Sequence, residues 1–200
     1  GSEFWADTPD ELNAGLDWDS RSGRVSGAID VYSRKTKDLL SVIPVPAGSN
    51  LTNQILTNVG NIENSGVEFT LNTRLIEKEK LSWDFGFNVT FNQNEVTNLT
   101  KVPNLNYQGV LVGGISGGVG NTLQIHTVGF PTFSYFVQKQ VYDESGKPVE
   151  GLYADLNGDG QVNLDDRYRY QQADPRLFLG INSQINIEDF SLSFVLRGNF

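Results

Sequence analysis

The feature that most constrains the fold of this chain is a strict alternation of apolar and polar residues between Leu81 and Phe91. The apolar positions are Leu81, Trp83, Phe85, Phe87, Val89 and Phe91, and the intervening positions are Ser82, Asp84, Gly86, Asn88 and Thr90. Successive side chains of a β-strand point to opposite faces, so a period of two predicts a strand with one apolar and one polar face.

The same alternation recurs along the chain, and 21 Gly and 7 Pro separate the alternating segments. These segments are Leu12–Trp18, Val25–Ser33, Val67–Arg74, Leu177–Ile187 and Phe190–Asn199. With Leu81–Phe91 they make six predicted strands, and helical periodicity is rare. The sequence therefore predicts an all-β fold.

The connections between these strands alternate in length. Short connections are expected at Asp19–Gly23, Glu77–Lys80 and Glu188–Asp189, and long ones at about 35–63 and 96–175. Compact domains rarely contain loops beyond about 12–15 residues. Outer-membrane barrels combine short periplasmic turns with long extracellular loops, so the pattern favours an antiparallel transmembrane β-barrel segment.

Aromatic residues support this interpretation, because Trp18, Trp83 and Phe190 all lie beside a short connection. Membrane barrels carry such aromatic residues where their strands cross the membrane surface. The alternative is a soluble β-sandwich, whose strands also alternate between an apolar and a polar face.

Composition excludes several functions. The formal charge of −9 leaves no basic surplus for phosphate groups, which argues against nucleic-acid binding. The absence of Cys removes disulfides, thiolate zinc sites and Cys nucleophiles. The single His126 cannot form a His pair, and no Ser-His-Asp triad or paired carboxylates emerge, so we expect no enzyme.

The most specific local motif is a calcium-loop pattern between residues 155 and 166, with Gly160 at the sixth position, where such loops turn sharply. The predicted metal-binding residues are Asp155, Asn157, Asp159, Gln161 (through its carbonyl), Asn163 and Asp166. Their oxygen atoms suit Ca²⁺, and we expect a structural ion that stiffens a long loop. A surface turn rich in Asn, Asp and Gly is the alternative.

An aromatic cluster follows Gly129 and comprises Phe130, Phe133, Tyr135 and Phe136. Two roles fit it: packing beneath the loop, which we favour for most of its members, and contact with a sugar or peptide ligand. Phe133, Tyr135 and Phe136 are the candidate ligand-contacting residues.

Several segments resemble the SusC/RagA-type TonB-dependent outer-membrane transporters of Bacteroidetes. They are Glu11–Trp18 (ELNAGLDW), Gly23–Leu40, Asn58–Leu71 (NVGNIENSGVEFTL), Gly118–Val128 (GVGNTLQIHTV), Gly151–Tyr168 (GLYADLNGDGQVNLDDRY) and Arg197–Phe200. The resemblance implies that residues 11–200 belong to an outer-membrane barrel, roughly 22-stranded, whose plug domain lies elsewhere in a longer polypeptide. Residues 1–10 form an N-terminal junction. Within it, Gly1–Phe4 is consistent with a cloning remnant and equally with a native segment.

The resemblance also implies a function. Such transporters import oligosaccharides or peptides with a SusD-like surface lipoprotein, and TonB energises them through regions absent from this sequence. The polar strand faces (Asp84, Asn88, Asn92, Asn182, Gln184 and Asn186) would line the lumen, and the apolar faces would meet outer-membrane lipid. The alternative is a soluble, secreted β-rich carbohydrate-binding module with a calcium-stabilised loop. A dockerin-like interaction module is a weaker alternative, because it needs a second calcium loop.

Overall fold

The dominant element of the computed structural model is one antiparallel sheet of six long strands in the order β1-β2-β3-β4-β11-β12. The structure describes residues 10–44, 54–100, 107–116 and 118–200. The strands of this main sheet are β1 (Asp10–Asp19), β2 (Val25–Pro44), β3 (Gln54–Lys78), β4 (Leu81–Asn98), β11 (Leu177–Ile187) and β12 (Phe190–Asn199).

An insertion between β4 and β11 carries two smaller sheets and one short 3-10 helix. The first sheet has the order β10-β7-β6-β5 and the second pairs β8 with β9. Their elements are β5 (Val110–Ile115), β6 (Gly118–His126), β7 (Ser134–Gln138), β8 (Gln140–Tyr142), β9 (Pro148–Tyr153), η1 (Leu164–Asp166) and β10 (Arg167–Gln172).

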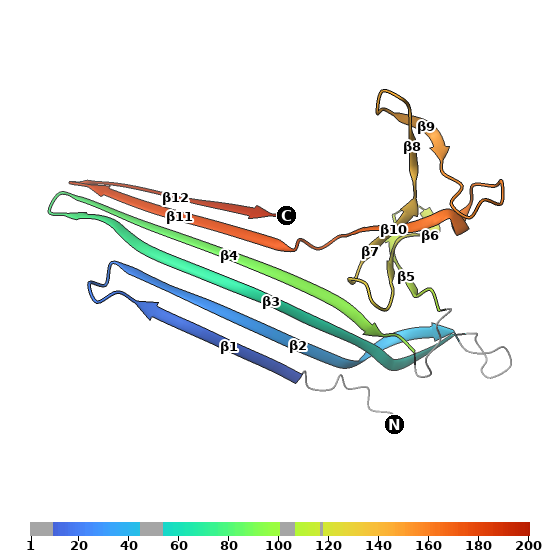
Figure 1. Cartoon of the computed structure of the whole chain (residues 1–200), viewed down its shortest axis with the longest axis horizontal. Coiled ribbons are helices and arrows are strands. Elements are labelled where there is room, and N and C mark those ends of the chain that lie inside the picture. Colours follow the sequence, from blue (N-terminus) through green and yellow to red (C-terminus); the bar gives the residue numbers. More distant parts are fainter. Residues whose placement is uncertain (1–9, 45–53, 101–106, 117) are drawn as a thin grey trace.

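The three short turns lie together at one end of the main sheet, and the insertion lies at the other (Figure 1). The turns join β1 to β2, β3 to β4 and β11 to β12. This arrangement confirms the predicted alternation between one end with short turns and one with long connections. No helix in the described segments is long and apolar enough to cross a membrane.

All six predicted strands are present, and β11 and β12 have the predicted bounds. The two long connections differ from the expectation. Pairing of β2 with β3 continues to Pro44 and Gln54, so much of the predicted 35–63 connection is hairpin. The predicted 96–175 connection holds β5 to β10. The N-terminal junction, Gly1–Phe4 included, lies outside the described residues, apart from Asp10 at the start of β1.

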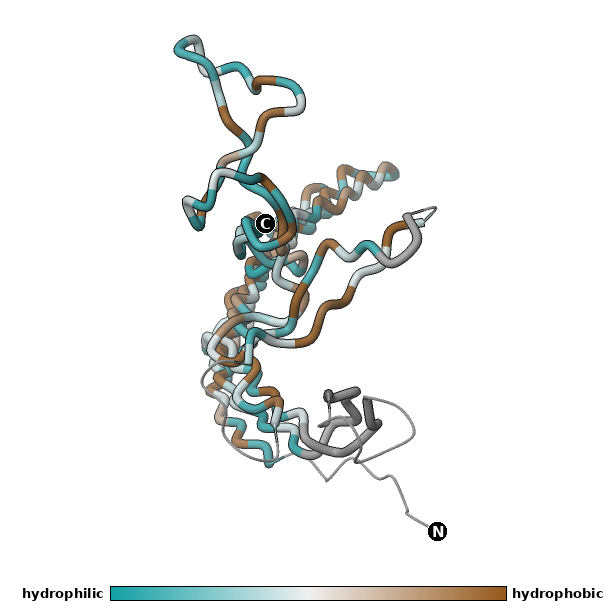
Figure 2. Tube along the Cα trace, turned by 90° about the vertical axis from the view of Figure 1, so that its right-hand side faces the viewer, coloured by the Kyte–Doolittle hydropathy of each residue, from teal (hydrophilic) through white to brown (hydrophobic). Residues whose placement is uncertain are grey.

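The strand register places the alternating apolar residues of the six strands on one face. Phe87 lies opposite Leu71 on β3 and Ile181 on β11, and Leu16 lies opposite Ile29. Figure 2 shows the sheet from its end as one curved layer, with apolar and polar residues alternating along the strands. No second layer covers this apolar face in the described part of the chain, and none of the apolar residues of Leu81–Phe91 is buried.

The buried hydrophobic residues lie away from this face, at the end of β4 and within the insertion. Among the described residues they are Val96, Leu99, Ile125 and Phe136. The main sheet therefore has no hydrophobic core of its own, unlike the two packed layers of a β-sandwich.

The predicted aromatic band is present on the apolar face near the short turns. Trp18 lies opposite Gly27, and its ring centroid is 5.9 Å from that of Phe69. Trp83 donates its indole N–H to the Ser183 hydroxyl at 2.9 Å. A Cβ at Gly27 would collide with the Trp18 ring, so this glycine allows the indole to lie flat across the neighbouring strand.

Candidate functional site

The polar face of the main sheet brings the predicted lumen residues together. Gln184 lies opposite Asp84, Asn186 opposite Ser82, and Asn92 opposite Gly66 on β3. The Asn186 side-chain amide donates to the Ser82 hydroxyl at 2.9 Å. The residues named from alternation therefore share one continuous polar surface.

A polar depression of about 550 Å³ lies on this face across the first four strands. Its lining comprises Glu11, Asn13, Asp30, Tyr32, Arg34, Asn64, Glu68 and Asn92. Arg34 forms an ion pair with Glu11 at 3.0 Å, and the Tyr32 hydroxyl donates to Asn92 at 3.1 Å. Of this set, the sequence predicts only Asn92 as a lumen residue, because the cluster depends on the register of four strands.

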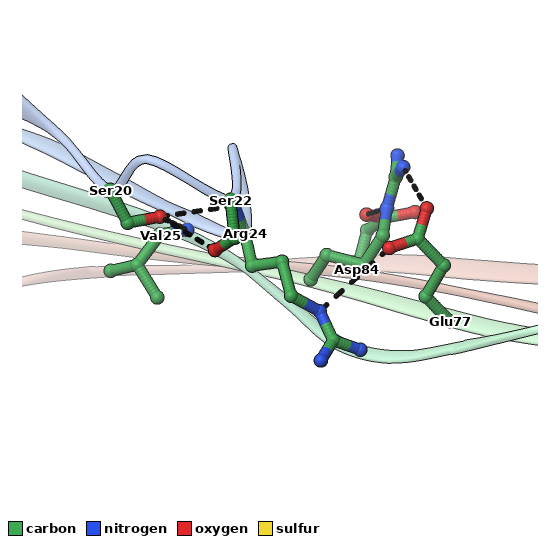
Figure 3. A network of polar contacts seen from close by, with 7 residues as sticks. Ser20, Ser22, Arg24, Val25, Glu77 and Asp84 are labelled. Carbon is green, nitrogen blue, oxygen red and sulfur yellow. Dashed lines mark hydrogen bonds and ion pairs between the residues drawn. The ribbon is translucent and has the colours of Figure 1, made fainter.

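A polar network closes the short-turn end of the sheet (Figure 3). Arg74 donates from Nε to Asp84 at 2.8 Å and from Nη1 to Glu77 at 3.3 Å. Arg24 pairs with the same Glu77 at 3.7 Å. The Ser20 hydroxyl accepts from the backbone amides of Arg24 and Val25, which shapes the β1–β2 turn.

The insertion is attached to the opposite end of β4 by a buried polar latch. The Asn94 side-chain oxygen accepts from the backbone amide of Thr132 at 2.7 Å and from its hydroxyl at 3.0 Å. The Val96 amide donates to the Phe130 carbonyl, and the Gly129 amide donates to the Val96 carbonyl. Because Asn94 and Thr132 are both buried, these bonds hold the insertion in one position on the sheet.

The predicted calcium loop folds as a turn closed by its own carboxylates. Asp155 accepts from the amides of Gly158 and Gly160, and Asp159 accepts from the amide of Gln161. Gly158 and Gly160 have φ of 77° and 81°, which favours glycine.

The C-terminal half of the loop is built around two side chains. Asn163 caps η1 by accepting from the Asp165 amide at 2.7 Å. Asp166 is fully buried and accepts from the amides of Leu156, Asn157 and Asn163. The bond from Asn163 is the strongest influence that lowers the pKa of Asp166, burial opposes it, and the bonds from Leu156 and Asn157 add to it.

The fit of this loop to Ca²⁺ is partial. Its carboxylate and amide oxygens are the donors that Ca²⁺ prefers, and a carboxylate oxygen that accepts one amide retains a second lone pair. However, no three His, Asp or Glu side chains of the described residues are grouped closely enough to hold a metal. The arrangement shown is a hydrogen-bonded turn, and calcium binding stays a prediction.

The aromatic cluster divides into buried and accessible members. Phe136 is 8% exposed, whereas Phe133 and Tyr135 are 41% and 37% exposed. The His126 ring meets Phe133 edge-on, with 4.6 Å between ring centroids. Burial lowers the pKa of His126, which fits a neutral packing residue.

Comparison with known proteins places this arrangement among barrel proteins. Residues 10–193 match the profile of a family described as TonB dependent receptor-like, beta-barrel. The TonB-dependent receptor SusC of Bacteroides thetaiotaomicron is 39% identical over 187 residues, which is 94% of this chain and 19% of SusC. The TonB-dependent receptor P3 of Formosa agariphila is 28% identical over 212 residues, 96% of this chain and 20% of the relative.

A solved structure agrees in fold. The RagAB peptide importer in its open-open state superimposes with a TM-score of 0.74 at 22% identity, covering 96% of this chain and 20% of the matched one. The chain spans about a fifth of the length of the curated relatives it matches.

Proposed function

Since this chain belongs to the TonB-dependent receptor-like β-barrel family, we propose that it forms part of the wall of an outer-membrane active importer. TonB-dependent receptors of this kind are outer-membrane β-barrel proteins. In the proposal the apolar sheet face meets lipid, the polar face lines the lumen, and the insertion projects outside the cell. No enzymatic activity is assigned to it.

The observation that carries the proposal is the uncovered apolar face of the main sheet. It extends over six strands, no second layer packs on it within the described residues, and the buried hydrophobic residues lie elsewhere. In water such a face costs free energy in proportion to its area, whereas in a bilayer it is solvated by acyl chains. The soluble carbohydrate-binding module would need these residues in a closed core.

The relatives support the substrate class and the partners that we propose. The matched RagAB protein is a peptide importer, and SusC is a TonB-dependent receptor. We assign this protein an oligosaccharide or peptide substrate, a SusD-like surface lipoprotein as partner, and energy from TonB through regions beyond this chain.

The same proposal places Ca²⁺ in the loop from Asp155 to Asp166 as a structural ion. Support comes from the spacing of the side chains, from their oxygen donors and from the lone pairs that remain after the amide bonds. When bound, the ion would cross-link the two halves of the loop.

Single-cysteine labelling of the full-length protein tests which face meets lipid. This segment contains no Cys, so Phe87→Cys and Asn88→Cys, adjacent on β4, form a matched pair. With a nitroxide label in lipid vesicles, we expect position 87 to collide mainly with dissolved oxygen and position 88 with a water-soluble nickel complex. Equal accessibility to the nickel complex at both positions would overturn the proposal.

A deletion strain tests the import function. Loss of the gene should abolish growth on either an oligosaccharide mixture or a peptide mixture as sole carbon source, with growth on glucose unchanged. The mixture that fails to support growth names the substrate class, and normal growth on both would count against import.

A further inference from the structure

The insertion contains a pocket of about 320 Å³, separate from the polar depression on the main sheet. It lies on the sheet formed by β5, β6 and β7, beside β9, η1 and the start of β10. Its apolar lining includes Leu111, Ile115, Leu123, Phe136, Tyr153 and Leu164. The volume falls in the range of about 300–1,000 Å³ typical of small-molecule sites.

The walls of this pocket are apolar but accessible. Leu111 is 46% exposed, Leu123 42% and Leu164 62%, although the same insertion buries Ile125 almost completely. Exposed apolar surface in a concave site favours an apolar occupant, because binding removes that surface from water.

One cationic side chain, Arg167, stands at the edge of the pocket in a restrained position. Its Nε–H donates to the Leu164 carbonyl at 3.0 Å. Its guanidinium carbon lies 4.7 Å from the centroid of the Phe136 ring, in a cation–π contact. A guanidinium held at two points loses little conformational freedom when it binds a ligand.

The outer nitrogen atoms of Arg167 are not neutralised. No carboxylate within the described segments forms an ion pair with Arg167, and its Nη atoms have no acceptor there. The neighbouring Asp166 carboxylate already accepts three backbone amides. The fork of an Arg side chain matches a carboxylate with two parallel hydrogen bonds.

We infer that this pocket binds an apolar group that carries a carboxylate. The apolar part would lie against Phe136, Leu164 and Leu111, and the carboxylate would accept from the Nη atoms of Arg167. Two sources offer this chemistry: the C-terminal residue of a peptide and a free aromatic or aliphatic acid. The inference goes beyond the proposed import function, because binding here can be measured whether or not the ligand is transported.

The test measures binding to the full-length protein in lipid nanodiscs by calorimetry. The probes are N-acetyl-L-phenylalanine, its amide, and N-acetyl-alanyl-phenylalanine. We expect the acid to bind at least about tenfold more tightly than the amide, because the amide cannot form the charged pair. We expect Arg167→Gln to abolish that difference.

The control is Arg169→Gln on the same strand. Arg169 also stacks on a ring, Phe130 at 4.4 Å, but it is outside the pocket lining. It should leave the affinity for the acid unchanged. Equal binding of acid and amide by the unmodified protein, no binding of either, or equal losses in both variants would overturn the inference.

The two phenylalanine acids separate the sources. Tighter binding of the dipeptide assigns a peptide C-terminus, and equal binding assigns recognition to the terminal acid alone; both results support the pocket. If Arg167→Gln fails to fold, the comparison of acid with amide on the unmodified protein still tests whether the pocket recognises a carboxylate.

Discussion

At the scale of single residues, the close approach of Trp18 to Gly27 makes a sharp prediction. In Gly27→Ala the new methyl group would collide with the indole ring and approach the Thr70 carbonyl. Overpacking of this kind costs about 1–3 kcal/mol, so the free energy of unfolding should fall by that amount. Thermal unfolding in detergent measures it.

Gly114→Ala is the matched control, because nothing lies within 4 Å of the position of its added Cβ. Its unfolding midpoint should stay close to that of the unmodified protein. An equal loss in both variants would show that the packing of Trp18 is not responsible.

Asn94 makes a second residue-scale prediction. Asn94→Ala leaves the buried Thr132 amide and hydroxyl without their acceptor, at a cost of about 1–3 kcal/mol. The insertion should loosen from β4, seen as faster hydrogen exchange at Thr132 and Gly129. The control is Asn88→Ala, on the exposed part of the same face. Unchanged hydrogen exchange in both variants would show that Asn94 does not hold the insertion on β4.

At the scale of elements, the loop around Asp166 should respond to acid. Its folded pKa is lowered below 3.8, mainly by the Asn163 amide, so its stabilisation is complete well above pH 3.8. The stabilisation is lost as the pH falls through the folded pKa. Hydrogen exchange at Leu156, Asn157 and Asn163, corrected for the intrinsic rate, should rise below pH 3.8.

Asp166→Ala checks the assignment, because it should expose the same three amides already at neutral pH. Unaltered protection of these amides in Asp166→Ala would show that the carboxylate does not close the loop.

Chelation tests the calcium prediction for the same loop. Removing Ca²⁺ with EDTA should increase proteolytic cleavage between residues 150 and 170, since the ion would cross-link the two halves of the loop. Asp155→Asn should weaken this response, and added Ca²⁺ should restore protection only in the unmodified protein. If EDTA does not alter the cleavage pattern, the loop is closed by the hydrogen bonds from its backbone amides alone, without an ion.

The strands show how far sequence alone reaches. The bounds of β11 and β12 follow from alternation, because each residue there faces either an apolar or a polar surface. Alternation fades from Arg34 to Asp38 and from Asn61 to Ser65. Even so, β2 and β3 are paired up to Thr36 and Ile62 and pair again from Leu39 and Gly60, after an irregularity in the register. In β5, Gly113 and Gly114 have no side chains that could show the alternation. The sequence therefore predicts this stretch as part of the long connection and not as a strand.

The site was predictable to a similar extent. The polar face followed from alternation, but the depression lined by Glu11, Asp30 and Glu68 needs the relative register of separate strands. The spacing of Asp155 and Asp159 indicated a loop with converging oxygens. It did not reveal that Asp166 would be buried under three amides, because burial depends on packing against the rest of the insertion.

At the scale of the whole molecule, the main sheet has two open edges and an uncovered apolar face. Among the described elements β1 pairs only with β2, and β12 pairs only with β11. We therefore expect the 200-residue chain alone to self-associate in detergent-free buffer and to elute as large species in size-exclusion chromatography. A monodisperse monomer in plain buffer would contradict a lipid-facing surface.

The position of all three short turns at one end of the sheet also determines which part of the protein is accessible from outside the cell (Figure 1). In the proposed orientation a large molecule outside the cell reaches the small sheets of the insertion first (Figure 1), while the long strands lie within the membrane. Any ligand too large to enter the lumen would therefore meet the segment between β4 and β11 before it meets the long strands.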